Sequence, residues 1–66
     1  MTDIQSRIMA RMADGRERTT DDLATALRIR PDEILQELVS MARVGTLTRE
    51  QIKDRQHRVS IWKAKP

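Results

Sequence analysis

The sequence predicts a small α+β domain that is mostly helical, in which three helices precede a C-terminal β-hairpin. The first observation is that apolar residues recur at helical spacing in three runs, separated by turn signals, between residues 3 and 44. The second is that the residues after them have strand composition, with apolar and polar positions alternating. With 66 residues, the chain is expected to fold as a single domain over residues 1–66.

A first helix is predicted over residues 3–13, because its apolar residues repeat on one face. That face consists of Ile4, Ile8, Met9 and Met12. Either Thr2 or Asp3 can cap the start of this helix, and Gly15 can end it in a left-handed conformation. Residues 16–18 then form a connector or a short strand.

A second helix is predicted over residues 20–28 from the start signal "TTDD". Thr19 or Thr20 is its N-cap, and the carboxylates of Asp21 and Asp22 complement the positive end of the helix dipole. Its buried stripe is expected to consist of Leu23, Ala24 and Leu27.

A third helix is predicted over residues 31–44, with Pro31 at its first position and Gly45 after its end. Its apolar arc comprises Ile34, Leu35, Leu38, Val39, Met41 and Ala42. Leu35 and Val39 lie toward the edge of this arc, so they are expected to be partly exposed. Its polar face presents Asp32, Glu33, Gln36, Ser40 and Arg43.

The C-terminal hairpin is predicted over residues 46–63. Its strands are expected in "TLTRE" and "RVSIWK", with a polar loop, "QIKDRQH", between them. The chain has one aromatic residue, Trp62, which is expected to cover the core at the base of the hairpin; the alternative is that it stacks on a base.

Basic residues are concentrated in the C-terminal third. Residues 43–66 hold seven basic and two acidic residues, a net charge of +5, whereas the other 42 residues hold six basic and eight acidic ones, a net charge of −2. The whole chain carries +3 and has an isoelectric point near 10.2. This distribution indicates a polyanionic partner that meets the hairpin.

The order of three helices and a basic hairpin resembles the winged helix-turn-helix superfamily. The segment "TTDDLATALRIRPDEILQELVSMARVGTLTR" resembles its helix–turn–helix–strand unit, and "RVSIWK" resembles the returning strand of its wing. Within the superfamily, the small size and the late Trp62 are similar to the bacterial regulators of fimbrial operons. The resemblance implies a DNA-binding transcriptional regulator whose third helix approaches the major groove while the wing contacts the phosphate backbone.

Two positions depart from the pattern of that superfamily. Arg28 stands where a glycine or another small residue is usual, and Arg30 stands where Ser or Thr usually caps the recognition helix. Both changes add a cation at the turn. The expected DNA-binding residues are therefore Arg28, Arg30, Gln36, Ser40, Arg43, Arg49, Lys53, Arg55 and Arg58.

Three residues of the third helix have two interpretations each. Gln36 either pairs with adenine through two hydrogen bonds or is an ordinary solvated glutamine. Asp32 and Glu33 either compensate the helix dipole, since no Ser or Thr cap is present here, or have a functional role. In that role they either repel phosphate, which would make the helix a weak groove binder, or face a protein.

The expected partner is double-stranded DNA, with a homodimer or a protein co-regulator to supply specificity. The alternative function is a protein-interaction module that uses the third helix and its Leu35–Val39 edge, and RNA binding by the wing is a further alternative. No catalytic constellation, cofactor or metal motif, small-molecule site or membrane span is expected. The absence of cysteine suits a reducing cytoplasm.

Overall fold

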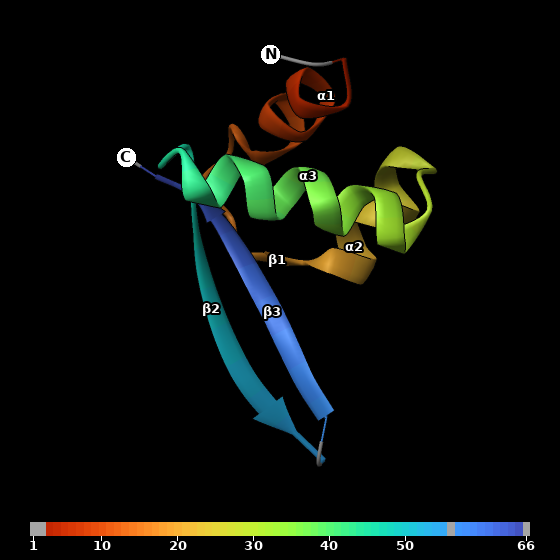
Figure 1. Ribbon diagram of the computed structural model, residues 1–66, viewed down its shortest axis with the longest axis vertical. Coiled ribbons are helices and arrows are strands. Elements are labelled where there is room, and N and C mark those ends of the chain that lie inside the picture. Colours follow the sequence, from red (N-terminus) through yellow and green to blue (C-terminus); the bar gives the residue numbers. More distant parts are fainter. Residues whose placement is uncertain (1–2, 56, 66) are drawn as a thin grey trace.

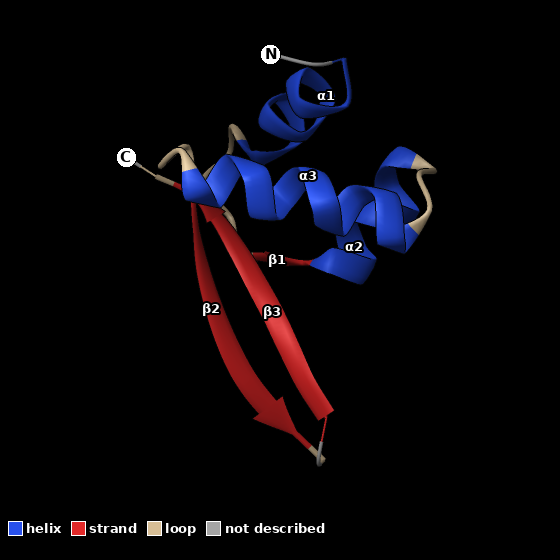
Figure 2. Ribbon diagram, in the orientation of Figure 1, coloured by secondary structure: helices blue, strands red, loops and turns tan. Residues whose placement is uncertain are grey.

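The computed structural model, which describes residues 3–55 and 57–65, places the helices together and projects the hairpin away from them (Figure 1, Figure 2). The elements in chain order are α1 (Asp3–Met12), β1 (Arg18–Thr19), α2 (Thr20–Leu27), α3 (Pro31–Arg43), β2 (Leu47–Asp54) and β3 (His57–Ala64). This arrangement confirms the predicted α+β class, with three helices before a β-hairpin.

The strands form one antiparallel sheet in the order β1-β3-β2. Strands β2 and β3 pair along their whole length, from Leu47 opposite Ala64 to Asp54 opposite His57. The polar loop expected over residues 51–57 was therefore wrong, because both strands continue through it to a tight turn. Arg55 occupies that turn with a positive φ of 47°, and Gln56 lies outside the described residues.

The start of α2 distinguishes between the two threonines. Thr19 Oγ1 accepts a hydrogen bond from the Asp22 backbone N–H at 3.1 Å, and the Asp22 carboxylate accepts one from the Thr19 N–H at 3.2 Å. This reciprocal capping box makes Thr19 the N-cap. The Thr20 hydroxyl instead accepts a hydrogen bond from Trp62 Nε1 at 2.8 Å, which joins α2 to the hairpin.

The core lies between the three helices and the base of the hairpin. Its buried residues are Ile8, Met12, Leu23, Ala24, Leu27, Ile34, Leu38, Met41, Leu47 and Trp62. Trp62 is fully buried, so the prediction that it covers the core is confirmed. Val39 packs partly buried against this core, and Leu35 is 37% exposed, so both lie at the edge of the apolar arc as expected.

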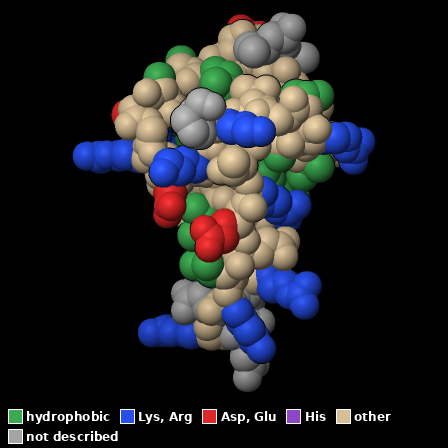
Figure 3. All heavy atoms as spheres, turned by 90° about the vertical axis from the view of Figure 1, so that its left-hand side faces the viewer, with side chains coloured by type: hydrophobic (Ala, Val, Ile, Leu, Met, Phe, Trp, Pro, Cys, Tyr) green, Lys and Arg blue, Asp and Glu red, His purple; other side chains and the backbone are tan. Residues whose placement is uncertain are grey.

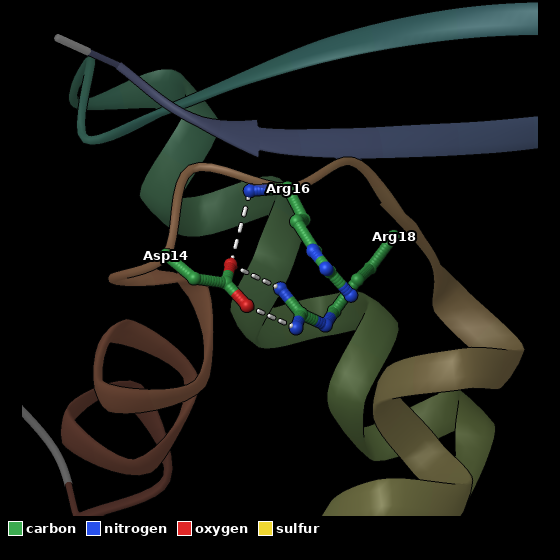
Figure 4. Close-up of polar contacts among 3 residues, drawn as sticks. All are labelled: Asp14, Arg16 and Arg18. Atoms are coloured by element: carbon green, nitrogen blue, oxygen red, sulfur yellow. Dashed lines mark hydrogen bonds and ion pairs between the residues drawn. The ribbon is translucent and has the colours of Figure 1, made fainter.

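A charged contact links the end of α1 to β1 (Figure 4). The Arg18 guanidinium donates two hydrogen bonds to the Asp14 carboxylate, at 2.8 and 2.6 Å, and the Arg16 backbone N–H donates a third at 3.0 Å. The two Arg18 hydrogen bonds, followed by that of Arg16, hold the pKa of the Asp14 carboxyl well below its usual range.

The depressed pKa of Asp14 predicts a pH-dependent contribution to stability. It is fully present above the carboxyl's ordinary pKa of about 3.9 and is lost as the pH falls through the lower pKa of the folded state. In thermal melts, Asp14→Asn should therefore lower the melting temperature at neutral pH, by an amount that shrinks below about pH 4. Arg18→Gln should lower the melting temperature with the same pH dependence. A difference in melting temperature between wild type and variant that grows as the pH falls would contradict this account.

Candidate nucleic-acid interface

The two faces of the hairpin differ in chemistry. Because side chains alternate along a strand, Arg49, Gln51 and Lys53 of β2 share one face, opposite Trp62, Ser60 and Arg58 of β3. Trp62 lies in the core, so this face is the one directed toward the helices. We call the set Arg49, Gln51, Lys53, Arg58 and Ser60 the cationic face. It holds no carboxylate, since Glu50 belongs to the opposite face.

The opposite face of the hairpin carries apolar residues. Ile52 is 43% exposed and lies directly opposite Val59, and Ile61 follows on the same face. Figure 3 shows this division, with hydrophobic side chains along one side of the projecting hairpin and Lys and Arg side chains around its other side and its tip. The cross-strand pair of Ile52 and Val59 stabilises the part of the hairpin that the core does not cover.

The cationic face and the starts of α2 and α3 enclose an open cleft of about 490 Å³. Arg49, Gln51, Arg58 and Ser60 line it from the hairpin. Asp21, Asp32 and Leu35 are among the residues that line it from the helices. A ligand that contacts the cationic face here also meets the first turns of α3.

Arg49 is held in place within this cleft. Its guanidinium carbon lies 5.1 Å from the centroid of the Trp62 ring, and its Nε and Nη2 donate hydrogen bonds to Ser60 Oγ at 3.2 and 2.9 Å. The cation–π contact and the hydrogen bonds restrict a side chain that otherwise has many rotamers. Arg49 therefore presents a positioned charge at the base of the hairpin.

The cations nearer the tip are arranged differently. Lys53 lies directly opposite Arg58 on the cationic face, and Arg55 follows in the turn. All three are exposed, and no carboxylate described in the structure forms an ion pair with any of them. Like charges on directly opposed residues destabilise a hairpin, so an anion bound between Lys53 and Arg58 would relieve their repulsion.

The exposed side of α3 brings together another group of the expected residues. Gln36, Ser40 and Arg43 surround a shallow groove of about 330 Å³ together with Leu35 and Val39. The three polar side chains are all exposed. We call this five-residue set the α3 groove. It combines amide, hydroxyl and guanidinium donors with two apolar side chains on one helix face.

The turn before α3 holds the two unusual arginines. Arg28 ends α2 in the left-handed conformation, with a φ of 56°, which is the geometry that glycine adopts most easily. Arg30 is the N-cap of α3 and makes no capping hydrogen bond with its side chain. Its Nε lies 3.6 Å from Asp32 Oδ1, with both side chains mostly exposed, so Asp32 partly offsets its charge.

The nine expected residues thus occupy three places, namely the turn, the α3 groove and the hairpin. Sequence reasoning missed Ser60 and Gln51 as members of the cationic face. Period-two alternation along the predicted strand "RVSIWK" would have found Ser60, which lies two residues from Arg58. Gln51 lay in the predicted loop, so its place on this face depends on the register of β2 with β3. It also missed the contact of Trp62 with Thr20, which depends on the packing of the hairpin against α2.

Comparison with solved structures identifies the architecture. Over 98% of its length, the chain superposes on the adhesin competence repressor (AdcR) from Streptococcus pyogenes, with a TM-score of 0.77 and 23% sequence identity. The chain has the winged-helix fold. In that fold, α2 and α3 form the helix-turn-helix and the β2–β3 hairpin is the wing. The match covers 47% of the repressor, so the winged-helix chain spans about half the length of that protein.

Neither a protein-family model nor a curated protein matches this winged-helix chain. Among the residues described, none of the helices is long and apolar enough to cross a membrane. Over the same residues, no group of three or more His, Cys, Asp or Glu side chains is placed to hold a metal ion. The features that distinguish its surface are the cationic face of the wing and the α3 groove.

Proposed function

We propose that this winged-helix protein is a DNA-binding transcriptional regulator, in which α3 enters the major groove and the wing contacts the adjacent phosphate backbone. The observation that carries this proposal is the separation of charge on the wing. Arg49, Lys53 and Arg58 lie on the face directed toward α3, without an acidic residue among them. Regulation would then follow from occupancy of the DNA site. The repressor function named for AdcR supports this class of activity.

The wing is proposed to supply most of the attraction. Cations that contact phosphates release condensed counterions, and this term does not depend on base sequence. The first turn of α3 carries Asp32 and Glu33, both exposed, which oppose that attraction. The helix would therefore set register and sequence preference more than affinity.

Binding to a labelled random-sequence duplex, measured by fluorescence anisotropy at low and moderate salt, tests this function. We expect measurable binding at low salt that weakens steeply as salt is added. An excess of unlabelled RNA should compete less well than unlabelled duplex. The absence of binding at low salt would reject the proposal, and stronger competition by RNA would favour RNA as the ligand of the wing.

The second candidate function is a protein-interaction module that uses α3. Leu35 is 37% exposed beside Val39, which is the observation in its favour. Replacing Asp32 and Glu33 by Asn and Gln separates the two functions. If α3 lies against DNA, the loss of two repelling carboxylates should tighten non-specific binding. The protein-interaction function predicts unchanged DNA affinity instead.

The same double variant should lose some stability. Acidic residues in a first turn stabilise a helix by about 0.3–1 kcal/mol each, and Arg30 provides no side-chain cap that would compensate for their loss. Melting curves should show this small decrease while the variant remains folded. DNA affinity that stays the same across low and moderate salt would show that α3 does not lie against the duplex.

Gln36 is the proposed base reader of the α3 groove. Replacing it by Ala should change preference at one base position by about 1–3 kcal/mol if it makes two hydrogen bonds to adenine. Binding to a library randomised across the site measures this profile. Gln51→Ala is the matched control, because it also replaces a glutamine by alanine but does so on the wing, in the cleft rather than in the α3 groove. It should leave base preference unchanged. An unaltered profile for Gln36→Ala would show that this residue is not a reader.

We further propose that a second copy or a protein co-regulator supplies the rest of the specificity, within the cytoplasm. One helix-turn-helix reads a single half-site, and dimeric members of this class bind two half-sites about one helical turn apart. Binding to duplexes with one or two copies of a selected site, at spacings of about 10 base pairs and of half that value, would measure this dependence.

A further inference from the structure

The α3 groove has an apolar side that the proposed hydrogen bonds do not use. Leu35 and Val39 are one helical turn apart and therefore lie side by side on α3. Leu35 is 37% exposed and lines both the groove and the cleft beneath the wing. The two side chains form an apolar strip along the flank of α3 that is nearer the wing.

The surroundings of this strip favour a polyanionic ligand. Arg43 lines the α3 groove, and the other residues that line this groove carry no charge. Arg49 and Arg58 extend from the wing into the cleft that Leu35 also lines, opposite Asp21 and Asp32 on the helices. The cations of the groove and of the wing therefore lie on the two sides of the strip. Exposed apolar patches that mark protein docking sites are contiguous and larger than a few hundred Å². This strip consists of two side chains, and Val39 is partly buried against the core. A ligand that is negatively charged yet offers small apolar groups fits this combination. The major groove of DNA does so through the C5-methyl group of thymine.

We infer that Leu35 and Val39 contact thymine methyl groups, beside an adenine that Gln36 hydrogen-bonds, and that the protein therefore selects sites with neighbouring A·T pairs. This inference rests on the proposed function. Gln36 is adjacent to Leu35 in the groove, so a base pair that meets the amide places its neighbour against the strip. Apolar contact recognises the methyl group, whereas the amide recognises the N7 and N6 edge of adenine.

The test uses duplexes in which single thymines are replaced by uracil, which removes only the C5-methyl group. A site is first selected from a random library with the wild-type protein, and each thymine is then exchanged in turn. At one or two positions next to the selected adenine, uracil should weaken binding about fourfold for each methyl group that is buried. Uracil outside the protected segment should have no effect.

Leu35→Ala provides the second measurement, with Val44→Ala as its matched control. Val44 is 76% exposed just beyond the end of α3 and does not line the groove. The difference between thymine and uracil should disappear in the Leu35 variant and persist in the Val44 variant. Because the uracil exchange with wild-type protein requires no variant, the inference can be tested even if Leu35→Ala unfolds.

Several outcomes would overturn the inference. They are a selected site without neighbouring A·T pairs, equal binding of thymine and uracil at every position, and a Leu35→Ala protein that keeps the full difference. In each case, salt-dependent binding of the duplex would leave the proposed function intact. Failure to retain any duplex at low salt would instead reject the proposed function itself, and with it this inference.

Discussion

Replacing Trp62 by Ala is expected to lower the free energy of unfolding by about 3–5 kcal/mol, as for other large core side chains. The Trp62 side chain is fully buried, and it joins the hairpin to α2 through its hydrogen bond to Thr20. Stabilities of about 0.05–0.15 kcal/mol per residue are usual, which for a chain of this size amounts to about 3–10 kcal/mol. The substitution should therefore remove a large part of the total, as thermal or urea unfolding would show.

Thr20→Val is the control for the hydrogen-bond component of this effect. It removes the acceptor and leaves the Nε1–H of the buried Trp62 without this hydrogen bond, while it keeps the shape of the residue at position 20. It should therefore cost about 1–3 kcal/mol. A loss as large as that of Trp62→Ala would show that the hydrogen bond, rather than core packing, dominates. A Trp62→Ala protein that melts like the wild type would contradict the buried position of this residue.

The second large effect concerns the salt dependence of DNA binding. Four wing contacts, from Arg49, Lys53, Arg55 and Arg58, predict a slope of log affinity against log salt of roughly −3.6. The affinity should then fall about 150-fold between about 50 mM and about 200 mM salt. The double variant Lys53→Gln/Arg58→Gln should halve that slope and fall only about 12-fold over the same range. Titrations of a labelled duplex at several salt concentrations measure both slopes.

The control for net charge is the double variant Arg11→Gln/Lys65→Gln. It removes the same number of charges from α1 and from the residue after β3, at the end of the molecule away from the wing tip (Figure 1). Its slope should stay close to that of the wild type. If both double variants reduce the slope equally, the net charge of the protein determines DNA binding, and the wing cations do not make specific phosphate contacts.

Sequence patterns predicted the helices and the core because those features depend on local spacing. Ile8, Ile34 and Leu38 repeat with the helical period, and each is fully buried in the structure. The length of the wing strands was not predictable in this way. Residues 51–57 contain one apolar residue, Ile52, so they carry little alternation, and their strand structure depends on the register with β3.

The candidate site was predictable in composition but not in arrangement. The excess of basic residues in the C-terminal third identified the wing cations. The placement of Arg49 over the Trp62 ring, and its hydrogen bonds to Ser60, join side chains 11 to 13 residues apart across two strands. Likewise, the choice of Thr19 over Thr20 as N-cap follows from the backbone geometry before α2, which composition does not specify.

Because the wing projects away from the helices, part of the favourable energy of its phosphate contacts is offset by the entropy lost when the tip becomes ordered. Near the tip, strand pairing holds the backbone, with Ile52 directly opposite Val59, and none of the described helices covers this part of the hairpin. Segments with few buried contacts open at a lower free energy than the core does, without unfolding the whole molecule. Every phosphate contact of Lys53, Arg55 and Arg58 therefore includes the entropy of ordering the segment that carries it. A second cross-strand pair of apolar residues near the tip, in addition to Ile52 and Val59, would order the tip before it binds. DNA affinity would then rise because less entropy is lost on binding, without any added contact to DNA.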